Sequence, residues 1–433
     1  MFNGLDIICV SSIDWDFLWQ QHQEIMSAFA RGNNRVLFIE NTGVRSPRLS
    51  RFDINRILHR VTTRWHAPRG FRRMHDRLDV YSPLVLPFPY SRVAQRVNRR
   101  ILVAAVRSWM RSVGAENPIL WTFLPTQITL DLMREVPHRL LVYYCTDNFA
   151  ATSAEASQVL PTEREVIRSA QAVFAMSQAM AEHCHRYNDA VVRIPMGVNL
   201  ERFERVREGT LESPDDLRGC RPPIIGYVGG VRHTIDQELI KRVARERPDW
   251  TLVFVGPIQM PIAELSAYPN IRFLGAKAHE EVARYIRAFD CCILPYVKNA
   301  YTDSVSPAKL FEYLIMGKPV VATDIAELAP LAASQSRCPI VYVAPDSETF
   351  LRYLDLAVTG PDGHAEARIA AARQQGWDRK IEMIATVIEE RLGACDAQTV
   401  RVSGGRAAGG AAREQNRPPL REAVPGGHHR SSL

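Results

Sequence analysis

Residues 303–324 read DSVSPAKLFEYLIMGKPVVATD and predict a short helix that delivers the chain into a buried strand. Ser306 can cap the free amides at a helix start, and Pro307 loses nothing at the first helical position. Gly317 predicts the end of the helix. The run VVAT at 320–323 has the composition of a buried parallel strand. We therefore expect one helix–strand unit of a parallel α/β sheet here.

The same alternation of short apolar runs and amphipathic helical patterns extends along most of the chain. It predicts repeated βα units on parallel sheets. A chain of 433 residues exceeds what one hydrophobic core usually holds. We expect an α/β fold with two doubly wound, Rossmann-like domains that face a cleft, with ligands at the carboxyl ends of the strands.

Composition along the chain sets the predicted boundaries. The first domain is expected over 1–205 and the second over 222–394, joined by the polar, turn-rich segment 206–221. The second domain should close with an amphipathic helix that ends at Gly393. The Gly-, Arg-, Pro- and Ser-rich segment 395–433 is expected to be a disordered basic tail.

The formal net charge of +7 is unevenly spread. Residues 45–77 hold ten arginines against two aspartates, and residues 401–433 hold six arginines against two glutamates. The remainder of the chain is mildly acidic. This distribution does not indicate nucleic-acid binding, but it does indicate a local contact with an anionic partner.

Cysteine usage and hydropathy favour a location inside the cell. The eight cysteines form no CxxC pair, which is typical of reduced thiols in the cytosol. The N-terminus lacks the basic segment of a secretory signal, and no apolar stretch approaches the roughly 20 residues that span a bilayer. His183, Cys184 and His185 are direct neighbours that do not converge on one helix face, so no metal site is predicted there.

Lys309 lies in the first turn of the predicted helix, where the helix dipole disfavours a cation by about 0.3–1 kcal/mol. One compensation is a surface pair with Glu312, three residues later on the same face. The other is a phosphate held by the lysine and the free amides. The residues leave both open. A carboxylate at Glu312 suits adjacent hydroxyls, as on a ribose, so the two side chains together describe a nucleotide site.

The stretch SPAKLFEYLIMGKPVVATD resembles the donor-site motif of GT-B glycosyltransferases of the family 4 type. The resemblance extends to GYVGG at 226–230, to the base-side segment at 270–296, to VVRIPMGVNLERF at 191–203, and to the returning helix GWDRKIEMI at 376–384. Together these stretches cover most of residues 1–394.

The resemblance implies a donor site in which Glu312 holds the ribose and the helix N-terminus faces a diphosphate. The implied donor residues are Gly229, Gly230, Arg232, Gly275, Ser304, Ser306, Pro307, Lys309, Leu310 and Glu312. The chain departs from the family's motif at two places, one near the donor sugar and one near the diphosphate. Many relatives carry a glutamate where this chain has Ser304, and others place Arg and Lys after the glycine loop, where this chain offers only Arg232 and His233.

The segment SSIDWDFLWQQHQ at 11–23 lacks the glycines of a dinucleotide fingerprint, which disfavours a Rossmann oxidoreductase. It resembles the first loop of bacterial polysaccharide glycosyltransferases, including those of teichuronic-acid type. The resemblance implies that Asp14, Trp15, Asp16 and Trp19 line the acceptor side. The alternative is that the tryptophans are core residues and the aspartates cap the following helix.

Asp147 follows the predicted strand RLLVYYC, on the cleft side of the sheet. It is the candidate acceptor contact or base, and a turn or capping role is the alternative. Lys309 and Arg232 complete the predicted catalytic set because they would stabilise the charge of a leaving diphosphate.

Residues 91–113 predict a helix with an apolar stripe and six arginines but no acidic residue. Packing of that stripe against the first sheet is the usual role of such a helix. The alternative is that the helix lies on anionic lipid. The stripe comprises Val93, Val97, Ile101, Ala105, Trp109 and Val113.

The expected function is transfer of a sugar from a nucleoside diphosphate sugar to a glycan or lipid-linked acceptor. The resemblance implies a retaining reaction without a metal or other cofactor, in bacterial cell-surface or exopolysaccharide synthesis. The expected location is the cytoplasm, and peripheral association at the anionic inner face of the membrane is left open. A nucleotide-sugar epimerase on the same fold and a non-catalytic sugar-nucleotide-binding subunit are the alternatives.

Overall fold

The computed structural model describes residues 2–16, 19–43, 70–151, 153–209, 212–333, 340–360 and 363–411, with the backbone alone for 332–333 and 396–411. Most of the arginine-rich segment 45–77, from 45 to 69, lies outside the described residues. The same holds for residues 412–433 of the predicted tail.

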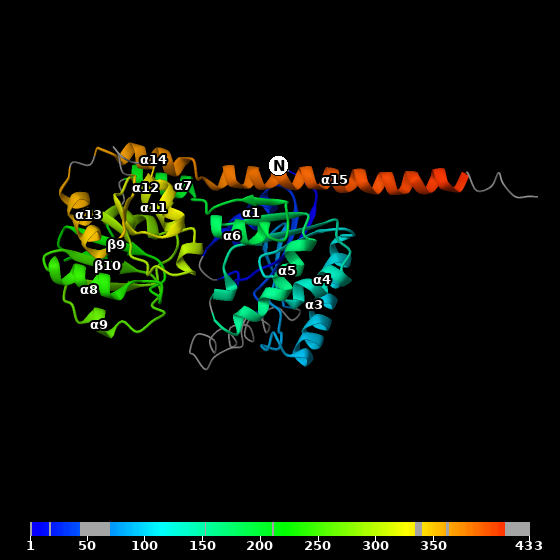
Figure 1. Cartoon of the computed structure of the whole chain (residues 1–433), viewed down its shortest axis with the longest axis horizontal. Helices are drawn as coiled ribbons and strands as arrows, with labels where there is room; N and C mark the ends of the chain where they lie inside the picture. The colour runs from blue at the N-terminus through cyan, green and yellow to red at the C-terminus, as the bar shows by residue number, and fades with distance from the viewer. Residues whose placement is uncertain are drawn as a thin grey trace, which may run out of the picture.

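Two α/β domains lie side by side, which confirms the predicted fold class (Figure 1). In the first sheet the strands follow the order β3-β4-β2-β1-β5-β6-β7-β8, and only β3 and β4 pair antiparallel. The strands are β1 (Asp6–Val10), β2 (Arg35–Ile39), β3 (Phe71–His75), β4 (Leu78–Tyr81), β5 (Ile119–Thr122), β6 (Leu140–Cys145), β7 (Ala172–Ala175) and β8 (Val191–Arg193). The helices are α1 (Gln21–Arg31), α3 (Arg92–Val113), α4 (Gln127–Glu135), η1 (Phe149–Ala151), η2 (Ala156–Val159), α5 (Leu160–Ser169) and α6 (Gln178–His185).

The second sheet is parallel throughout, in the order β11-β10-β9-β12-β13-β14. Its strands are β9 (Ile224–Val228), β10 (Thr251–Val255), β11 (Ile271–Gly275), β12 (Cys291–Leu294), β13 (Val320–Thr323) and β14 (Tyr342–Ala344). The helices are α7 (Leu200–Glu208), η3 (Asp215–Leu217), α8 (Gln237–Glu246), α9 (Ala263–Ser266), α10 (Val282–Ala288), η4 (Thr302–Ser304), α11 (Ala308–Ile315), η5 (Ala326–Leu328), α12 (Ala329–Ala333), α13 (Ser347–Thr359), α14 (Ala365–Arg373) and α15 (Trp377–Ala411).

The central strands are apolar because helices cover both faces of each sheet. Strand β6 is buried at all its positions, and so are β9 and β10. Such strands read as continuous apolar runs, which is why their positions could be predicted from the sequence.

Helix α3 has the predicted extent but buries a different face. Its buried side chains are Ala94, Asn98, Leu102, Val103, Val106, Trp109 and Met110. Of the predicted stripe only Trp109 belongs to this set, whereas Val93 and Val97 are exposed. The predicted stripe was wrong because each step of four residues advances about 40° beyond a full turn. Residues 93 and 113 therefore lie on nearly opposite sides of the helix.

The chain crosses between the domains twice, at one place. Val198 pairs in parallel with Gly376, its amide donates to the Gln375 carbonyl (2.9 Å), and the Trp377 amide donates to the Val198 carbonyl (3.1 Å). A methyl group on Gly197 would lie 2.6 Å from the Trp377 ring. The two crossings therefore pack closely against each other at one junction.

Two helices near the predicted domain boundaries pack against the other domain. Phe203 and Val206 of α7 belong to the core of the second domain. Helix α15 crosses to the first domain (Figure 1), where Trp377, Ile381 and Ile388 join its core. The predicted helix end at Gly393 is not observed, since α15 continues to Ala411. A single glycine costs a helix only about 1 kcal/mol, so it need not end one.

Glu327 of η5 joins the second domain to the first. Its carboxylate accepts hydrogen bonds from the Gln178 amide (2.6 Å), at the start of α6, and from Nη2 of Arg193 (2.8 Å). Ala326 beside it donates from its amide to Oδ1 of Asp303 (3.0 Å) in η4. We call this contact the Glu327 clasp.

Over the described part of the chain, none of the helices combines the length and the apolar character that crossing a bilayer requires.

Candidate active site

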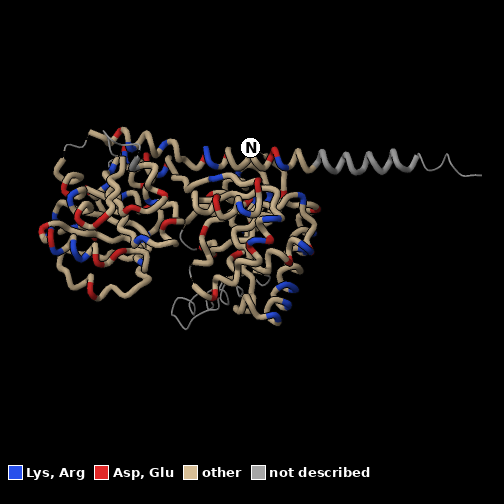
Figure 2. Tube along the Cα trace, viewed as in Figure 1, with Lys and Arg blue, Asp and Glu red and all other residues tan. Residues whose placement is uncertain are grey.

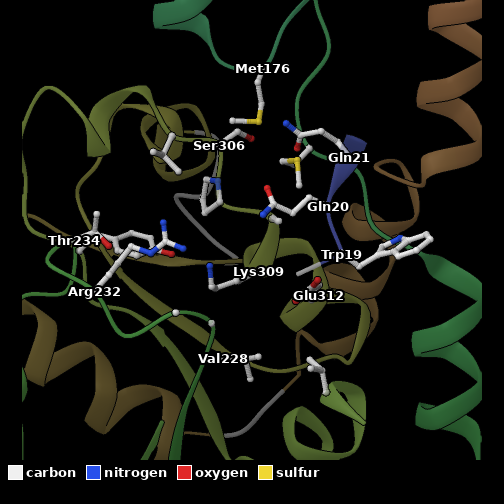
Figure 3. A pocket seen from close by; sticks show the side chains of 18 of the residues that line it. Trp19, Gln20, Gln21, Met176, Val228, Arg232, Thr234, Ser306, Lys309 and Glu312 are labelled. Atoms are coloured by element: carbon white, nitrogen blue, oxygen red, sulfur yellow. The ribbon is translucent and has the colours of Figure 1, made fainter. Parts of the chain in front are cut away.

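A cavity of about 540 Å³ lies between the two domains. Its walls come from the carboxyl ends of strands in both sheets, as predicted for a doubly wound fold: Asp147 follows β6, Met176 follows β7, and Val228 ends β9. Figure 3 shows Lys309 between Arg232 and Glu312, with Trp19 and Gln20 contributed by the first domain.

Helix α11 begins at Ala308, one residue later than predicted, and Pro307 takes the capping position without a side-chain cap. Ser306 is buried in the cavity wall and does not cap the helix, because Pro307 stands between it and the first helical residue, Ala308. The Leu310 amide donates to the Pro307 carbonyl (3.1 Å), whereas the amides of Ala308 and Lys309 precede the first intrahelical bond, and both residues line the cavity. The N-terminus of α11 therefore faces this space.

The far end of α11 is fixed as predicted. Gly317 has φ +73°, its amide donates to the Leu314 carbonyl (2.9 Å), and the Lys318 amide donates to the Tyr313 carbonyl (3.1 Å). This pair of bonds is a Schellman end.

Lys309 extends along the glycine loop that follows β9. A methyl group on Gly229 would lie 1.9 Å from Cε of Lys309, so the lysine occupies the space that a side chain at 229 would need. Its ammonium lies 5.8 Å from the centre of the Tyr227 ring. On the other side of the loop, the Arg232 guanidinium covers Gly230, where a methyl group would lie 3.1 Å from Nη2. The two glycines thus let two cations approach the loop.

Tyr313 connects α11 to that loop. The Val228 amide donates to Oη of the buried Tyr313 (2.8 Å), and Oη of Tyr227 donates to the Gly230 carbonyl (3.2 Å). These bonds fix the helix N-terminus relative to Gly229 and Gly230.

Glu312 lies one turn into α11 and faces the cavity. Burial raises the pKa of its carboxyl, and the charges of Lys309 and Arg202 oppose this rise. No ion pair joins Lys309 to Glu312 among the described residues, and both side chains are half-buried in the cavity wall. The surface pair that the sequence left open is therefore not formed.

Asp147 faces Arg232 and Tyr301 from the opposite domain. Burial raises the pKa of Asp147, while a hydrogen bond from Thr146 Oγ1 (3.3 Å) and the charge of Arg232 lower it. Burial, and then the charge of Asp147, raise the pKa of Tyr301 to about 12. The two domains together thus place a carboxylate, a guanidinium and a phenol in one cavity.

Several predicted donor residues lie outside the cavity. Leu310 packs in the core of the second domain. Gly275 has φ +70°, and its carbonyl accepts from the Gly256 amide (2.8 Å). Ser304 donates from Oγ to the Tyr301 carbonyl (2.6 Å) and lines a separate cavity of about 170 Å³ that also contains Glu163.

The first loop divides in a way that neither sequence interpretation expected. Trp15 is a core residue, packed edge-on against Phe38, and Asp14 does not line the cavity. Asp16 and Trp19 do line it, with Asp16 paired to Nη1 of Arg72 (2.7 Å). Neither aspartate caps α1, whose capping residue is Gln20.

Sequence reasoning missed further lining residues of the second domain, besides Tyr301. Lys277 pairs with Asp216 (2.6 Å). Burial, and then the charge of Arg202, lower the pKa of His279 to about 4, so this imidazole is neutral at pH 7. Both residues follow β11, and polar residues just after a strand that ends at the cleft would have been the signal.

Among the described residues no three His, Cys, Asp or Glu side chains lie close enough together to hold a metal ion. His183 contacts Glu163 (Nε2 to Oε2, 3.3 Å) and Arg186 (Nδ1 to Nη2, 3.1 Å).

Comparison with known proteins identifies the second domain. The family model described as Glycosyl transferases group 1 matches residues 222–358. The chain carries a group 1 glycosyltransferase domain. The predicted family is thereby confirmed for this domain. TuaH of Bacillus subtilis strain 168, whose name assigns it to teichuronic acid biosynthesis as a glycosyltransferase, is 29% identical over 291 residues. That match covers 62% of this chain and 70% of TuaH.

Solved structures share the fold of this glycosyltransferase at low sequence identity. Sucrose-phosphate synthase of Thermosynechococcus elongatus matches with a TM-score of 0.65 and 16% identity, over 90% of this chain and 100% of that chain. HepE of Anabaena, solved in complex with UDP, gives 0.59 and 14%, over 89% and 100%. A glycosyltransferase of Rickettsia africae gives 0.61 and 13%, over 90% and 99%. The architecture is therefore GT-B.

Proposed function

We propose that the cavity binds a nucleoside diphosphate sugar and that the chain transfers the sugar to a hydroxyl of a glycan or lipid-linked acceptor. The observation that carries this proposal is the convergence of Lys309, Arg232 and the N-terminus of α11 in one cavity, with Glu312 one turn away. Two cations and free amides suit a diphosphate, and a carboxylate suits the two hydroxyls of a ribose.

The departing diphosphate is the group that these cations would stabilise. Lys309 and Arg232 lie on either side of the glycine loop, and the first-turn amides of α11 add fixed dipoles. Such preorganised charge lowers the barrier for bond breaking, since little reorganisation is needed when the negative charge develops. In this proposal no metal is required.

The acceptor would enter from the wall of the first domain. Asp147 is placed there to bind the acceptor hydroxyl or to accept its proton, with Asp16 and Trp19 nearby in the same cavity.

The similarity to TuaH supports a role in bacterial cell-surface or exopolysaccharide synthesis. We propose retention of the anomeric configuration on the resemblance of the donor motif to family 4 glycosyltransferases, and a site of action at the cytosolic side of the membrane.

The test is calorimetry with UDP, GDP, ADP and dTDP sugars on the wild type and on Glu312→Ala. One nucleotide class should bind the wild type, and the variant should bind it about tenfold to a hundredfold more weakly, because two hydrogen bonds to a carboxylate are lost. An unchanged dissociation constant would refute the ribose assignment.

Two further measurements test the reaction itself. Product analysis with the donor alone should show no epimerised sugar, and transfer to an added acceptor should continue in EDTA.

A further inference from the structure

Five large apolar side chains are exposed on the first domain, on the segment before α3 and on the first turns of that helix. Phe88 is 53% exposed and Val93 66% exposed, values far above those of core residues. The set comprises Leu84 (44%), Leu86 (40%), Phe88, Val93 and Val97 (38%). Together they are the apolar patch.

Hydrogen bonds hold the two halves of the apolar patch together. The side chain of the buried Asn98 accepts from the Leu86 amide (2.7 Å) and donates to the Leu86 carbonyl (2.9 Å). Nε2 of Gln95 donates to the Pro89 carbonyl (2.8 Å). The segment that carries Leu86 and Phe88 is therefore fixed against the turns that carry Val93 and Val97, and the patch is a built surface.

A row of arginines borders the apolar patch. Arg92, Arg96 and Arg100 follow one another at a spacing of four, so they lie next to each other along α3. All three are exposed, and none has an ion-pair partner among the described residues. Glu135 pairs with Arg99 and Arg107 instead. Figure 2 shows the lower end of α3 carrying blue residues without red ones.

We propose that the apolar patch and its arginine row dock the enzyme on an anionic lipid surface. Aromatic and aliphatic side chains would enter the boundary between headgroups and acyl chains, and the arginines would remain at the level of the phosphates. A soluble acidic partner would satisfy the arginines but would leave the protruding Phe88 and Val93 in water.

A second copy of the chain is a poor occupant for the same surface. In a twofold interface both copies contribute the same patch, so both arginine rows would enter one interface and like charges would be brought close together. A lipid surface has the opposite charge and accepts apolar side chains, so it satisfies both parts.

The docking surface belongs to the same domain as Asp147, which lines the cavity. Tyr90, next to the apolar patch, is affected by Glu155: burial, and then the charge of Glu155, raise the pKa of Tyr90 to about 12. Glu155 belongs to the segment that leaves the cavity after Asp147. The purpose of docking rests on the proposed function, because a lipid-linked acceptor would be presented at the membrane. The proposal that the surface binds lipid rests only on the apolar patch and its arginine row.

The experiment measures flotation of the full chain with phosphatidylcholine vesicles and with vesicles that also contain phosphatidylglycerol. The wild type should float only with the anionic vesicles. Arg92→Gln, Arg96→Gln and Arg100→Gln combined should weaken binding by about a hundredfold, since each surface arginine contributes about a fivefold factor. Phe88→Ser with Val93→Ser should also weaken it, whereas the matched control Leu356→Ser, at an exposed site of α13, should not.

Thermal unfolding of each variant is the control for misfolding. Because all substituted residues are exposed, each variant should unfold at about the same temperature as the wild type. Absence of wild-type binding to anionic vesicles would overturn the proposal, and so would equal binding by the patch variants. A dimer in light scattering that dissociates in the patch variants would assign the surface to a second copy instead. Donor calorimetry and flotation are independent measurements. A negative result in one therefore does not change the interpretation of the other.

Discussion

At Gly229 the backbone has φ +138°, and the Lys309 side chain fills the space where a side chain would stand. We expect Gly229→Ala to displace Lys309 and to weaken binding of the donor nucleotide at least tenfold, as measured by calorimetry. The matched control is Gly219→Ala, which has φ +80° and nothing within 4 Å of the added methyl group. Both variants should lose stability by about 1–3 kcal/mol from backbone strain. Equal donor affinity in the two variants would refute the role of this space.

Asp147 predicts a pH dependence with a definite sign. Burial raises its pKa above the ordinary value of 3.8, so the folded state favours the neutral carboxyl. This contribution to the free energy of unfolding is fully present at a pH below the ordinary pKa of the carboxyl. It is lost as the pH rises through the raised pKa of the folded state. We therefore expect Asp147→Asn, which never ionises, to unfold at a higher temperature than the wild type at pH 7 and to lose this advantage near pH 4.

The same variant should lower the rate of transfer by about a hundredfold or more if Asp147 accepts the proton of the acceptor. The acid limb of the wild-type rate profile should then lie above pH 3.8 and disappear in the variant. A variant that keeps the wild-type profile would exclude Asp147 as the base.

Between elements, the contact of α11 with β9 sets the geometry of the donor site. Tyr313→Phe leaves the buried Val228 amide without an acceptor, which should cost about 1–3 kcal/mol of stability in denaturant unfolding. Donor affinity should fall as well, because the helix N-terminus is no longer fixed to the glycine loop.

Tyr144→Phe is the matched control for Tyr313→Phe. It removes a buried hydroxyl that donates to the Ile194 carbonyl (2.7 Å) in the first domain. It should reduce stability and leave donor affinity unchanged. Equal affinity losses in both variants would mean that the loss reflects general destabilisation.

A strand could be predicted from the sequence where its own residues form a recognisable pattern. Buried parallel strands such as β6 and β9 are continuous apolar runs, so their positions followed from composition. Strand β3 carries FRRMH and lies at the sheet edge, where its side chains are largely exposed and no apolar run marks it. Prediction thus worked for strands with a continuous apolar run, such as β6 and β9, and failed for β3.

Within the site, the direction of individual side chains was not readable from the sequence. Lys309 and Glu312 point into the cavity because α11 has an apolar face that must pack on the sheet. Trp15 and Trp19 sit in one loop, yet only Trp19 reaches the cavity, because Trp15 packs on Phe38 far away in sequence. Packing against residues distant in sequence determines which way a loop side chain points, and the spacing of residues along the loop does not reveal it.

For the whole molecule, the Glu327 clasp predicts a closed arrangement of the domains. Only 4% of the Glu327 side chain is exposed, and it accepts from two groups of the first domain. Glu327→Gln should open the domains, seen as a larger radius of gyration in small-angle scattering, and lower transfer about tenfold, because Asp147 faces Arg232 only when the domains are closed.

Donor affinity should survive in Glu327→Gln, since Glu327 does not line the cavity. Glu264→Gln is the matched control, because it removes an exposed ion pair with Lys241 inside the second domain. A scattering curve identical to that of the wild type would show that the clasp does not hold the domains together.

The return of α15 to the first domain determines the order in which the protein can be completed during synthesis. Trp377, Ile381 and Ile388 are nearly the last described core residues to leave the ribosome, yet they cover a sheet whose strands were made first. Part of one face of that sheet therefore stays uncovered while the second domain is translated. A nascent chain of this enzyme should depend on chaperones through that interval, and the two domains mature together although each has its own core.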